Sequence, residues 1–249
     1  MNAFLDVRGI SKRFGGLLAV SDASFTVAEG SITGLIGPNG AGKTTLFAIV
    51  SGFERPTTGQ VLWRGETITG RAPHLLARAG IARTFQIVQP FAGLSVRENI
   101  AVGAFLRHHR RVDAIAVAEQ VAEQVGLTDE LDKPAAALTV SGRKRVELAK
   151  ALATQPKLLL LDEVLAGLNP SEVRDIVPVV RAIAASGITV LMIEHVMQAV
   201  MNLCQSVHVL AQGRIIASGT PAAGVANTAV IEAYLGLGAA TRLAGGAHA

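Results

Sequence analysis

The chain has 249 residues and a formal net charge of +4, with 23 Lys and Arg against 19 Asp and Glu. Half of its residues are hydrophobic but only 4% are aromatic, so the core must be mainly Ala, Val, Leu and Ile, which suits buried parallel strands flanked by helices. The one cysteine, Cys204, excludes an internal disulfide. The mild positive charge is compatible with phosphate-bearing ligands but does not identify them.

The front of the chain is predicted to mix antiparallel strands with one strand–loop–helix unit. Residues 4–10 and 18–27 alternate between apolar and polar side chains and predict strands. Residues 31–37 form a short apolar run that ends in a glycine-rich turn, and a helix is expected from Lys43. Residues 59–65, behind the turn signal RPTTG, predict another strand.

From about residue 90 to residue 156 the pattern becomes helical, which predicts an inserted helical subdomain. The helix over residues 112–126 ends at Gly126, a typical C-terminal cap. Its apolar face is predicted to contain Ile115, Ala118, Val121 and Val125.

The chain then returns to buried strands. Residues 157–164 and 188–195 predict strands, and a helix over residues 169–187 with an internal kink at Pro178 separates them. Residues 206–219 predict a hairpin around Gln212 and Gly213. A single domain is expected to span residues 1–236, and residues 237–249 are expected to form a flexible tail.

The segment GPNGAGKTT fits the pattern G-x-x-x-x-G-K-[ST], which predicts a phosphate-binding loop. Its glycines let backbone N–H groups turn toward phosphate oxygens, and the following helix directs the positive end of its dipole at the anion. Lys43 is expected to reach the β- and γ-phosphates of a nucleoside triphosphate, and Thr44 to ligate Mg²⁺. The loop comprises Gly37, Pro38, Asn39, Gly40, Ala41, Gly42, Lys43, Thr44 and Thr45.

Four polar residues at strand ends complete the candidate chemistry. Asp162 and Glu163 end the apolar strand LLLLD, where an aspartate holds Mg²⁺ and an adjacent glutamate can take a proton from water. His195 ends the strand VLMIEH and is a candidate for contacting the γ-phosphate. Gln86, in ARTFQ, ends a short strand, and its amide can touch both Mg²⁺ and water.

The order of these pieces along the chain resembles the ATP-binding cassette (ABC) family of transporter ATPases, over roughly residues 4–236. Three segments look most like the ATPase subunits of branched-chain amino-acid importers: residues 12–47, 82–100 and 162–172. The resemblance implies an α/β P-loop NTPase cassette. Such a cassette has a RecA-like core, an antiparallel β subdomain and an inserted helical subdomain.

The resemblance also implies roles for single residues. Phe14 matches the aromatic residue that stacks on adenine, Gln86 the Q-loop glutamine and Asp162 the Walker B aspartate. Glu163 matches the catalytic base and His195 the switch histidine. The D-loop, residues 166–169, carries Asn169 where the family normally has Asp. The implied metal ligands are Thr44, Gln86 and Asp162, and the implied cofactors are ATP and Mg²⁺.

The stretch LTVSGRKRVELAKAL, residues 138–152, matches the family's signature, commonly LSGGQ. Thr139 keeps a hydroxyl for the γ-phosphate, but Val140 and Ser141 replace two glycines. Ser141 can offer its own hydroxyl, and Gly142 stands where the glutamine is usual. Because the helix N-terminus is retained, we expect a modified but functional contact.

The resemblance implies partners as well. Two cassettes dimerise head to tail, so the signature of one serves the ATP of the other; a heterodimer is favoured and a homodimer remains open. We expect the chain on the cytoplasmic face of the membrane, peripherally attached to permease subunits and working indirectly with a periplasmic or extracellular solute-binding protein. No nucleic-acid partner is expected. Val88, Pro90 and Phe91 are candidates for the groove that receives the permease.

The predicted function is that of an ATPase subunit that powers uptake of branched-chain or related polar amino acids. Two alternatives share the motifs: urea or amide import, and lipopolysaccharide export. A P-loop phosphotransferase is the alternative from another class. The absence of an N-K-x-D motif speaks against a GTPase.

Overall fold

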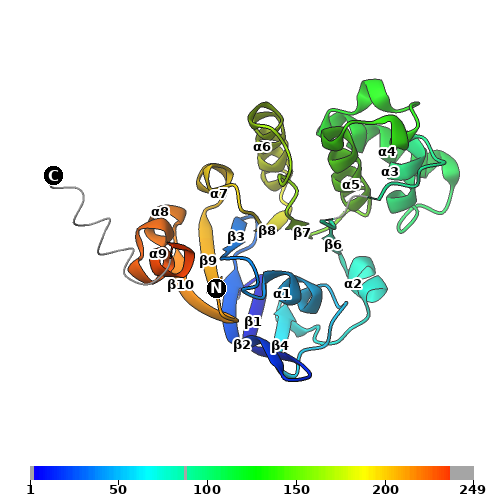
Figure 1. Ribbon diagram of the computed structural model, residues 1–249. Coiled ribbons are helices and arrows are strands. Elements are labelled where there is room, and N and C mark those ends of the chain that lie inside the picture. The colour runs from blue at the N-terminus through cyan, green and yellow to red at the C-terminus, as the bar shows by residue number, and fades with distance from the viewer. Residues whose placement is uncertain (1–2, 87–88, 236–249) are drawn as a thin grey trace, which may run out of the picture. The chain divides into compact units, whose positions relative to one another are not determined.

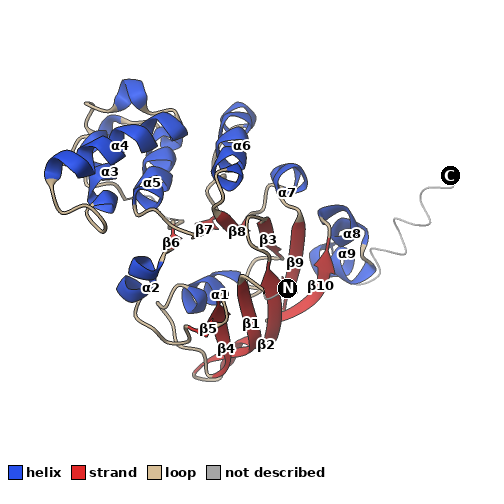
Figure 2. Ribbon diagram, turned by 180° about the vertical axis from the view of Figure 1, so that it is seen from behind, coloured by secondary structure: helices blue, strands red, loops and turns tan. Residues whose placement is uncertain are grey.

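The computed structural model describes residues 3–86 and 89–235 and divides into two compact units (Figure 1). Unit 1 comprises Met1–Arg71 and Leu191–Ala249, and unit 2 comprises Ala72–Val190. Strand β8 (Thr189–Ile193) crosses from unit 2 into unit 1. Both units mix helices with strands, so the chain is of the α/β class that its composition predicts (Figure 2).

The first part of unit 1 is an antiparallel sheet in the order β2-β1-β4-β5. Its strands are β1 (Leu5–Phe14), β2 (Leu17–Val27), β4 (Thr58–Trp63) and β5 (Glu66–Thr67). The two glycines between β1 and β2 make the tight turn, because Gly15 takes a φ of 54° and Phe14 pairs with Leu17. The alternation of buried and exposed residues along β2 confirms the predicted strand.

The second part of unit 1 carries the phosphate loop. Strand β3 (Ile32–Ile36) is buried throughout and pairs in parallel with β9 (Ser206–Ala211). The hairpin of β9 and β10 (Arg214–Gly219) turns at Gln212 and Gly213, whose φ values are 48° and 78°. The helices of this unit are α1 (Lys43–Val50), α7 (Met197–Leu203), α8 (Pro221–Ala226) and α9 (Thr228–Leu235).

Unit 2 places a helical cluster beside a short parallel pair of strands, β6 (Ile81–Arg83) and β7 (Leu158–Asp162). Figure 2 shows α3, α4 and α5 packed together. The helices are α2 (Pro73–Ala79), α3 (Val96–Ala104), α4 (Arg111–Val125), α5 (Val140–Ala153) and α6 (Pro170–Ala185). The helical segment predicted over residues 90–156 contains α3 to α5, and its limits as a subdomain remain a prediction.

Two details of the predicted elements need correction. Helix α4 buries Ala114, whereas Ile115 is only half-buried. The strand before Gln86 ends at Arg83, so Gln86 lies in the loop beyond it. Pro178 lies inside helix α6, and the kink expected there stays a prediction. The proposed tail at residues 237–249 lies outside the described residues.

The buried polar groups of unit 1 include one histidine and one cysteine. His208 on β9 bonds Ser218 Oγ through Nδ1 (2.8 Å) and the Thr26 carbonyl through Nε2 (2.9 Å). Since Nε2 must donate to the carbonyl, Nδ1 accepts from the serine, and burial lowers the pKa of this neutral imidazole. Burial, reinforced by Glu194, raises the pKa of the Cys204 thiol to about 12, so it stays protonated at neutral pH.

Within the described ranges, none of the helices combines the length and the apolar character that a membrane crossing requires.

Candidate nucleotide-binding site

The phosphate loop joins β3 to α1 in unit 1, as the sequence predicts. Neither Gly37 nor Gly42 can carry a side chain here. A Cβ on Gly37 would lie 1.9 Å from the Leu210 carbonyl oxygen, and a Cβ on Gly42 would lie 2.5 Å from the Ala19 carbonyl oxygen. Gly42 also has a φ of 105° and caps α1 without a side-chain hydrogen bond. The first amide groups of α1 thus lack a side-chain cap from the residues that the structure describes, which suits an anion.

The Lys43 ammonium is folded back over the loop. Its Nζ donates to the carbonyl oxygens of Gly37 (2.7 Å) and Pro38 (2.9 Å), and the residue is buried. The backbone of Ala41 is tied to the rest of unit 1 through its carbonyl, which accepts from Gly213 N–H at 3.0 Å. The loop is therefore pre-shaped, with its cation held at the phosphate-binding turn.

Unit 1 also contains Phe14, His195 and Tyr234. Phe14 ends β1 with its ring 43% exposed, and the Lys12 ammonium lies 4.7 Å from the ring centroid. His195 is exposed, two residues after β8. Sequence reasoning missed Tyr234 on α9: burial raises the pKa of its hydroxyl, and a hydrogen bond from the Gly37 backbone opposes that rise.

Unit 2 holds Asp162 and Glu163 at the end of β7. Glu163 has a φ of 52°, a left-handed conformation that costs a non-glycine residue about 1–3 kcal/mol. Two side chains from elsewhere in the unit fix it. Gln86 Nε2 donates to Glu163 Oε2 at 2.7 Å, and Lys144 Nζ donates to the Glu163 carbonyl oxygen at 3.0 Å.

Asp162 is held by the end of β6. Its backbone N–H donates to Thr84 Oγ1 (3.0 Å), and its Oδ2 accepts from Arg83 Nη2 (2.7 Å). Sequence reasoning missed both partners, since they lie nearly eighty residues away in the chain. Asp162 Oδ1 is buried and has no hydrogen-bond partner among the described residues. Because Mg²⁺ prefers oxygen ligands and keeps several waters, this unpartnered carboxylate oxygen fits a hydrated Mg²⁺.

The signature stretch opens α5 in unit 2, as predicted. Thr139 is the N-cap, and its Oγ1 accepts from Gly142 N–H at 3.1 Å. Val140 is half-exposed, whereas Ser141 is buried, with only 8% of its surface accessible. The Thr139 hydroxyl therefore caps α5, and the backbone N–H groups of the first turn of α5 lie beside it.

Asn169, which stands where the family carries Asp, caps α6. Its Oδ1 accepts from the N–H groups of Ser171 (2.9 Å) and Glu172 (3.0 Å), and the Asn169 N–H donates to Glu172 Oε2 (2.9 Å). Asn and Asp are equally good helix caps, so the substitution preserves the local turn while removing one negative charge.

The segment predicted to receive a permease is anchored by Asn99 of α3. The Asn99 amide accepts from Phe91 N–H (2.8 Å) and donates to the carbonyls of Phe91 (3.1 Å) and Ser95 (3.0 Å). The Phe91 ring is half-exposed, with Lys150 Nζ 5.0 Å from its centroid. Pro90 is half-buried, and Val88 lies outside the described residues.

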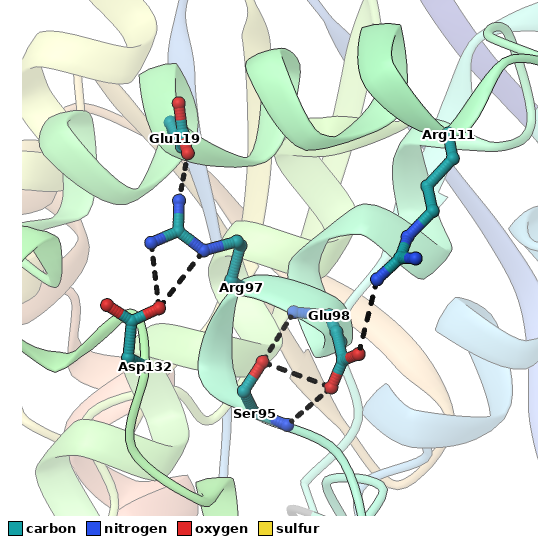
Figure 3. A network of polar contacts seen from close by, with 6 residues as sticks. All are labelled: Ser95, Arg97, Glu98, Arg111, Glu119 and Asp132. Carbon is teal, nitrogen blue, oxygen red and sulfur yellow. Dashed lines mark hydrogen bonds and ion pairs between the residues drawn. The ribbon is translucent and has the colours of Figure 1, made fainter.

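A charged network holds this segment to the rest of the helical cluster (Figure 3). Arg97 pairs with Glu119 of α4 and with Asp132, whose Oδ1 lies 2.8 Å from Arg97 Nη2. Ser95 and Glu98 form a capping box, and the bonds from the Ser95 backbone and hydroxyl lower the pKa of Glu98. The start of α3 is therefore fixed to α4 and to the chain that leads into the signature.

The predicted residues fall into two groups. Unit 1 carries Phe14, the phosphate loop and His195, and unit 2 carries Gln86, Asp162, Glu163 and the signature helix. Of these, the structure brings Gln86 and Glu163 into direct contact.

Comparison with known proteins identifies the family of this chain. Residues 20–166 match the family model described as ABC transporter, and residues 214–240 match the model described as branched-chain amino acid ATP-binding cassette transporter. The second match covers β10, α8 and α9, the part of unit 1 that includes Tyr234.

Curated relatives include the high-affinity branched-chain amino acid transport ATP-binding proteins BraF of Pseudomonas aeruginosa and LivG of Escherichia coli K12. They are 39% and 36% identical to this chain, and each alignment covers 93% of this chain and 97% of the relative. A crystal structure of a nucleotide-free ATP-binding cassette superposes with a TM-score of 0.86 at 32% identity, covering 94% of this chain and all of that one. The chain therefore belongs to the ABC transporter family, as an ATP-binding cassette with the P-loop ABC fold.

Proposed function

We propose that this chain is the ATP-hydrolysing subunit of an importer for branched-chain or related polar amino acids. The observation that carries the choice of solute is the match of residues 214–240 to the branched-chain family model. The names of the full-length relatives from two bacteria support it.

In this proposal the phosphate loop binds ATP and Phe14 stacks on the adenine. Lys43 leaves the carbonyls of Gly37 and Pro38 for the β- and γ-phosphates, and the uncapped start of α1 stabilises their charge. Because the Lys43 ammonium already lies at the turn, it needs to move only a short distance to contact the phosphates.

Hydrolysis is assigned to Glu163, Gln86 and His195. Glu163 takes a proton from the attacking water, a role worth roughly 10²–10⁴-fold in rate. The 2.7 Å bond from Gln86 orients the Glu163 carboxylate, and His195 contacts the γ-phosphate. Thr44, Gln86 and Asp162 would hold Mg²⁺, which would supply positive charge against the negative charge that develops on the phosphates.

We place the active unit in a dimer of cassettes. In it, Thr139, Ser141 and Gly142 at the start of α5 serve the ATP held by the partner's phosphate loop, the partner being either a related cassette or a second copy. The permease subunits bind at the segment around Pro90 and Phe91, on the cytoplasmic face of the membrane, and a solute-binding protein delivers the solute from outside.

Solute uptake in a strain deleted for this gene tests the proposal. Uptake of labelled leucine, isoleucine and valine is expected to fall and to return with the wild-type gene, but not with Lys43→Ala. Labelled urea uptake and the amount of surface lipopolysaccharide distinguish the two alternatives. Normal leucine uptake together with lost urea uptake or lost lipopolysaccharide would replace the proposed solute by that alternative.

A further inference from the structure

Arg83 and Asp162 form a buried ion pair inside unit 2. In the parallel pairing of β6 with β7, Arg83 lies opposite Leu160. Asp162 follows two residues later on β7 and so points to the same side of the sheet. The Arg83 Nη2 to Asp162 Oδ2 distance is 2.7 Å, and the side chains are 9% and 2% exposed.

The pair leaves the two carboxylate oxygens of Asp162 unequal. Oδ2 accepts a hydrogen bond from the Arg83 guanidinium, while Oδ1 is buried and has no hydrogen-bond partner within the described part of the chain. A carboxylate has about four acceptor positions, so a buried one normally gathers several donors. One oxygen is thus paired with a permanent cation, and the other is left for a ligand that the described residues do not supply.

The charges explain why such an arrangement is useful. A buried carboxylate without a counter-charge is strongly unfavourable, so a cation is needed whenever no metal is bound. Arginine stays charged at any working pH and cannot dissociate. Once a divalent cation approaches Asp162, the same guanidinium repels it and lowers its affinity.

We propose that Arg83 is the resident counter-cation of Asp162, which holds the carboxylate with Oδ1 available for hydrated Mg²⁺ and weakens the binding of that ion. The inference rests on the proposed role of Asp162 at the metal. Arg83 is a positioning residue in this account, since it acts through Asp162.

The test measures binding of Mn²⁺, a spectroscopic stand-in for Mg²⁺, to the purified full chain saturated with ADP. Free Mn²⁺ is followed by electron paramagnetic resonance, so the readout is independent of hydrolysis. The variants are Arg83→Gln, Arg83→Lys, Asp162→Asn and the double variant Arg83→Gln/Asp162→Asn. Arg78→Gln, at an exposed arginine of α2, is the matched control.

We expect Arg83→Gln to bind Mn²⁺ roughly tenfold more tightly than the wild type, because one repelling charge is gone. Arg83→Lys, which keeps the charge, and Arg78→Gln should stay close to the wild type. Asp162→Asn should bind more weakly, and adding Arg83→Gln to it should change little. Arg83→Gln binding no more tightly than the wild type, while Asp162→Asn weakens binding, would overturn the inference and leave the proposed metal site intact.

Two further outcomes of the Mn²⁺ experiment can be distinguished from each other. Unchanged Mn²⁺ binding in Asp162→Asn would refute the role of Asp162 itself and the inference with it. Should Arg83→Gln fail to fold, the double variant decides, because it removes both buried charges together. Recovery of folding in the double variant supports the counter-cation role, whereas failure of both shows that Arg83 acts through other contacts.

Discussion

Gln86 and Glu163 meet in unit 2 through a 2.7 Å hydrogen bond from the glutamine Nε2 to the carboxylate Oε2. The bond joins the loop beyond β6 to the turn beyond β7 and sets the direction of the carboxylate. The side chain of the proposed base is therefore oriented by a residue of its own unit.

Replacing Gln86 by Ala should lower kcat for ATP hydrolysis roughly 10- to 100-fold, because the Glu163 carboxylate loses the donor that orients it. The KM for ATP should change much less, since the phosphate loop is untouched. Steady-state phosphate release measures both constants. Gln120→Ala, at an exposed glutamine of α4, is the control, and a kcat equal to the wild type in both variants would show that the bond is dispensable.

Lys144 fixes the backbone of the same residue. Lys144→Met removes the donor to the Glu163 carbonyl, 3.0 Å away, and releases a turn held at a φ of 52°. We expect kcat to fall about tenfold, because small displacements of a reacting group are costly, and Lys144→Arg to recover part of it. The exposed Lys157→Met is the control. Equal loss in the Met and Arg variants would point instead to a general disturbance of α5.

Phe91 offers a test of the permease contact. Phe91→Ala removes a half-exposed ring whose backbone is fixed on both sides by Asn99, so the fold of the chain should be unaffected. We expect the basal ATPase rate to stay the same and co-purification with the permease to be lost. Phe53→Ala, at an equally exposed ring in unit 1, should retain the permease. Retention by both variants would place the contact elsewhere.

His208 predicts a pH dependence of stability. Burial lowers its pKa below the ordinary 6.5, so the unfolded chain binds more protons than the folded one at mildly acid pH. The contribution of the neutral His208 to the free energy of unfolding is fully present above about pH 6.5. It is lost as the pH falls toward the lowered pKa, by up to about 1.4 kcal/mol per pH unit.

Urea unfolding at several pH values between 5 and 8 measures this effect. The free energy of unfolding should fall more steeply below pH 6.5 in the wild type than in His208→Gln, which cannot take up a proton. The variant will be less stable throughout, since its amide cannot reproduce both the Ser218 and the Thr26 contacts. The slopes are therefore compared, and identical slopes would contradict a neutral buried imidazole.

The phosphate loop and the signature helix were predictable because their signals are local. The glycines of the loop, Lys43 and the strand before them lie within about a dozen residues. Thr139 indicates the start of a helix because its side chain caps the turn that directly follows it. The same holds for the hairpin at Gln212 and Gly213, whose residues suit the required backbone angles.

The partners of the acidic pair were not predictable in this way. Arg83 is 79 residues from Asp162 in sequence, and only the pairing of β6 with β7 places them together. Lys144 of α5 is likewise buried and donates to the Glu163 carbonyl, a contact between separate elements. Such contacts depend on the packing of separate elements, which a single sequence does not reveal.

The most direct test of the central claim is ATP hydrolysis by the purified chain as a function of its concentration. Where the partner is a second copy of this chain, we expect a specific activity that rises with concentration and disappears in Lys43→Ala and Glu163→Gln, because the two copies complete each other's site. ATP binding without hydrolysis at any concentration would instead require a different partner cassette. A specific activity that does not change with concentration would contradict the dimeric mechanism and favour the phosphotransferase alternative.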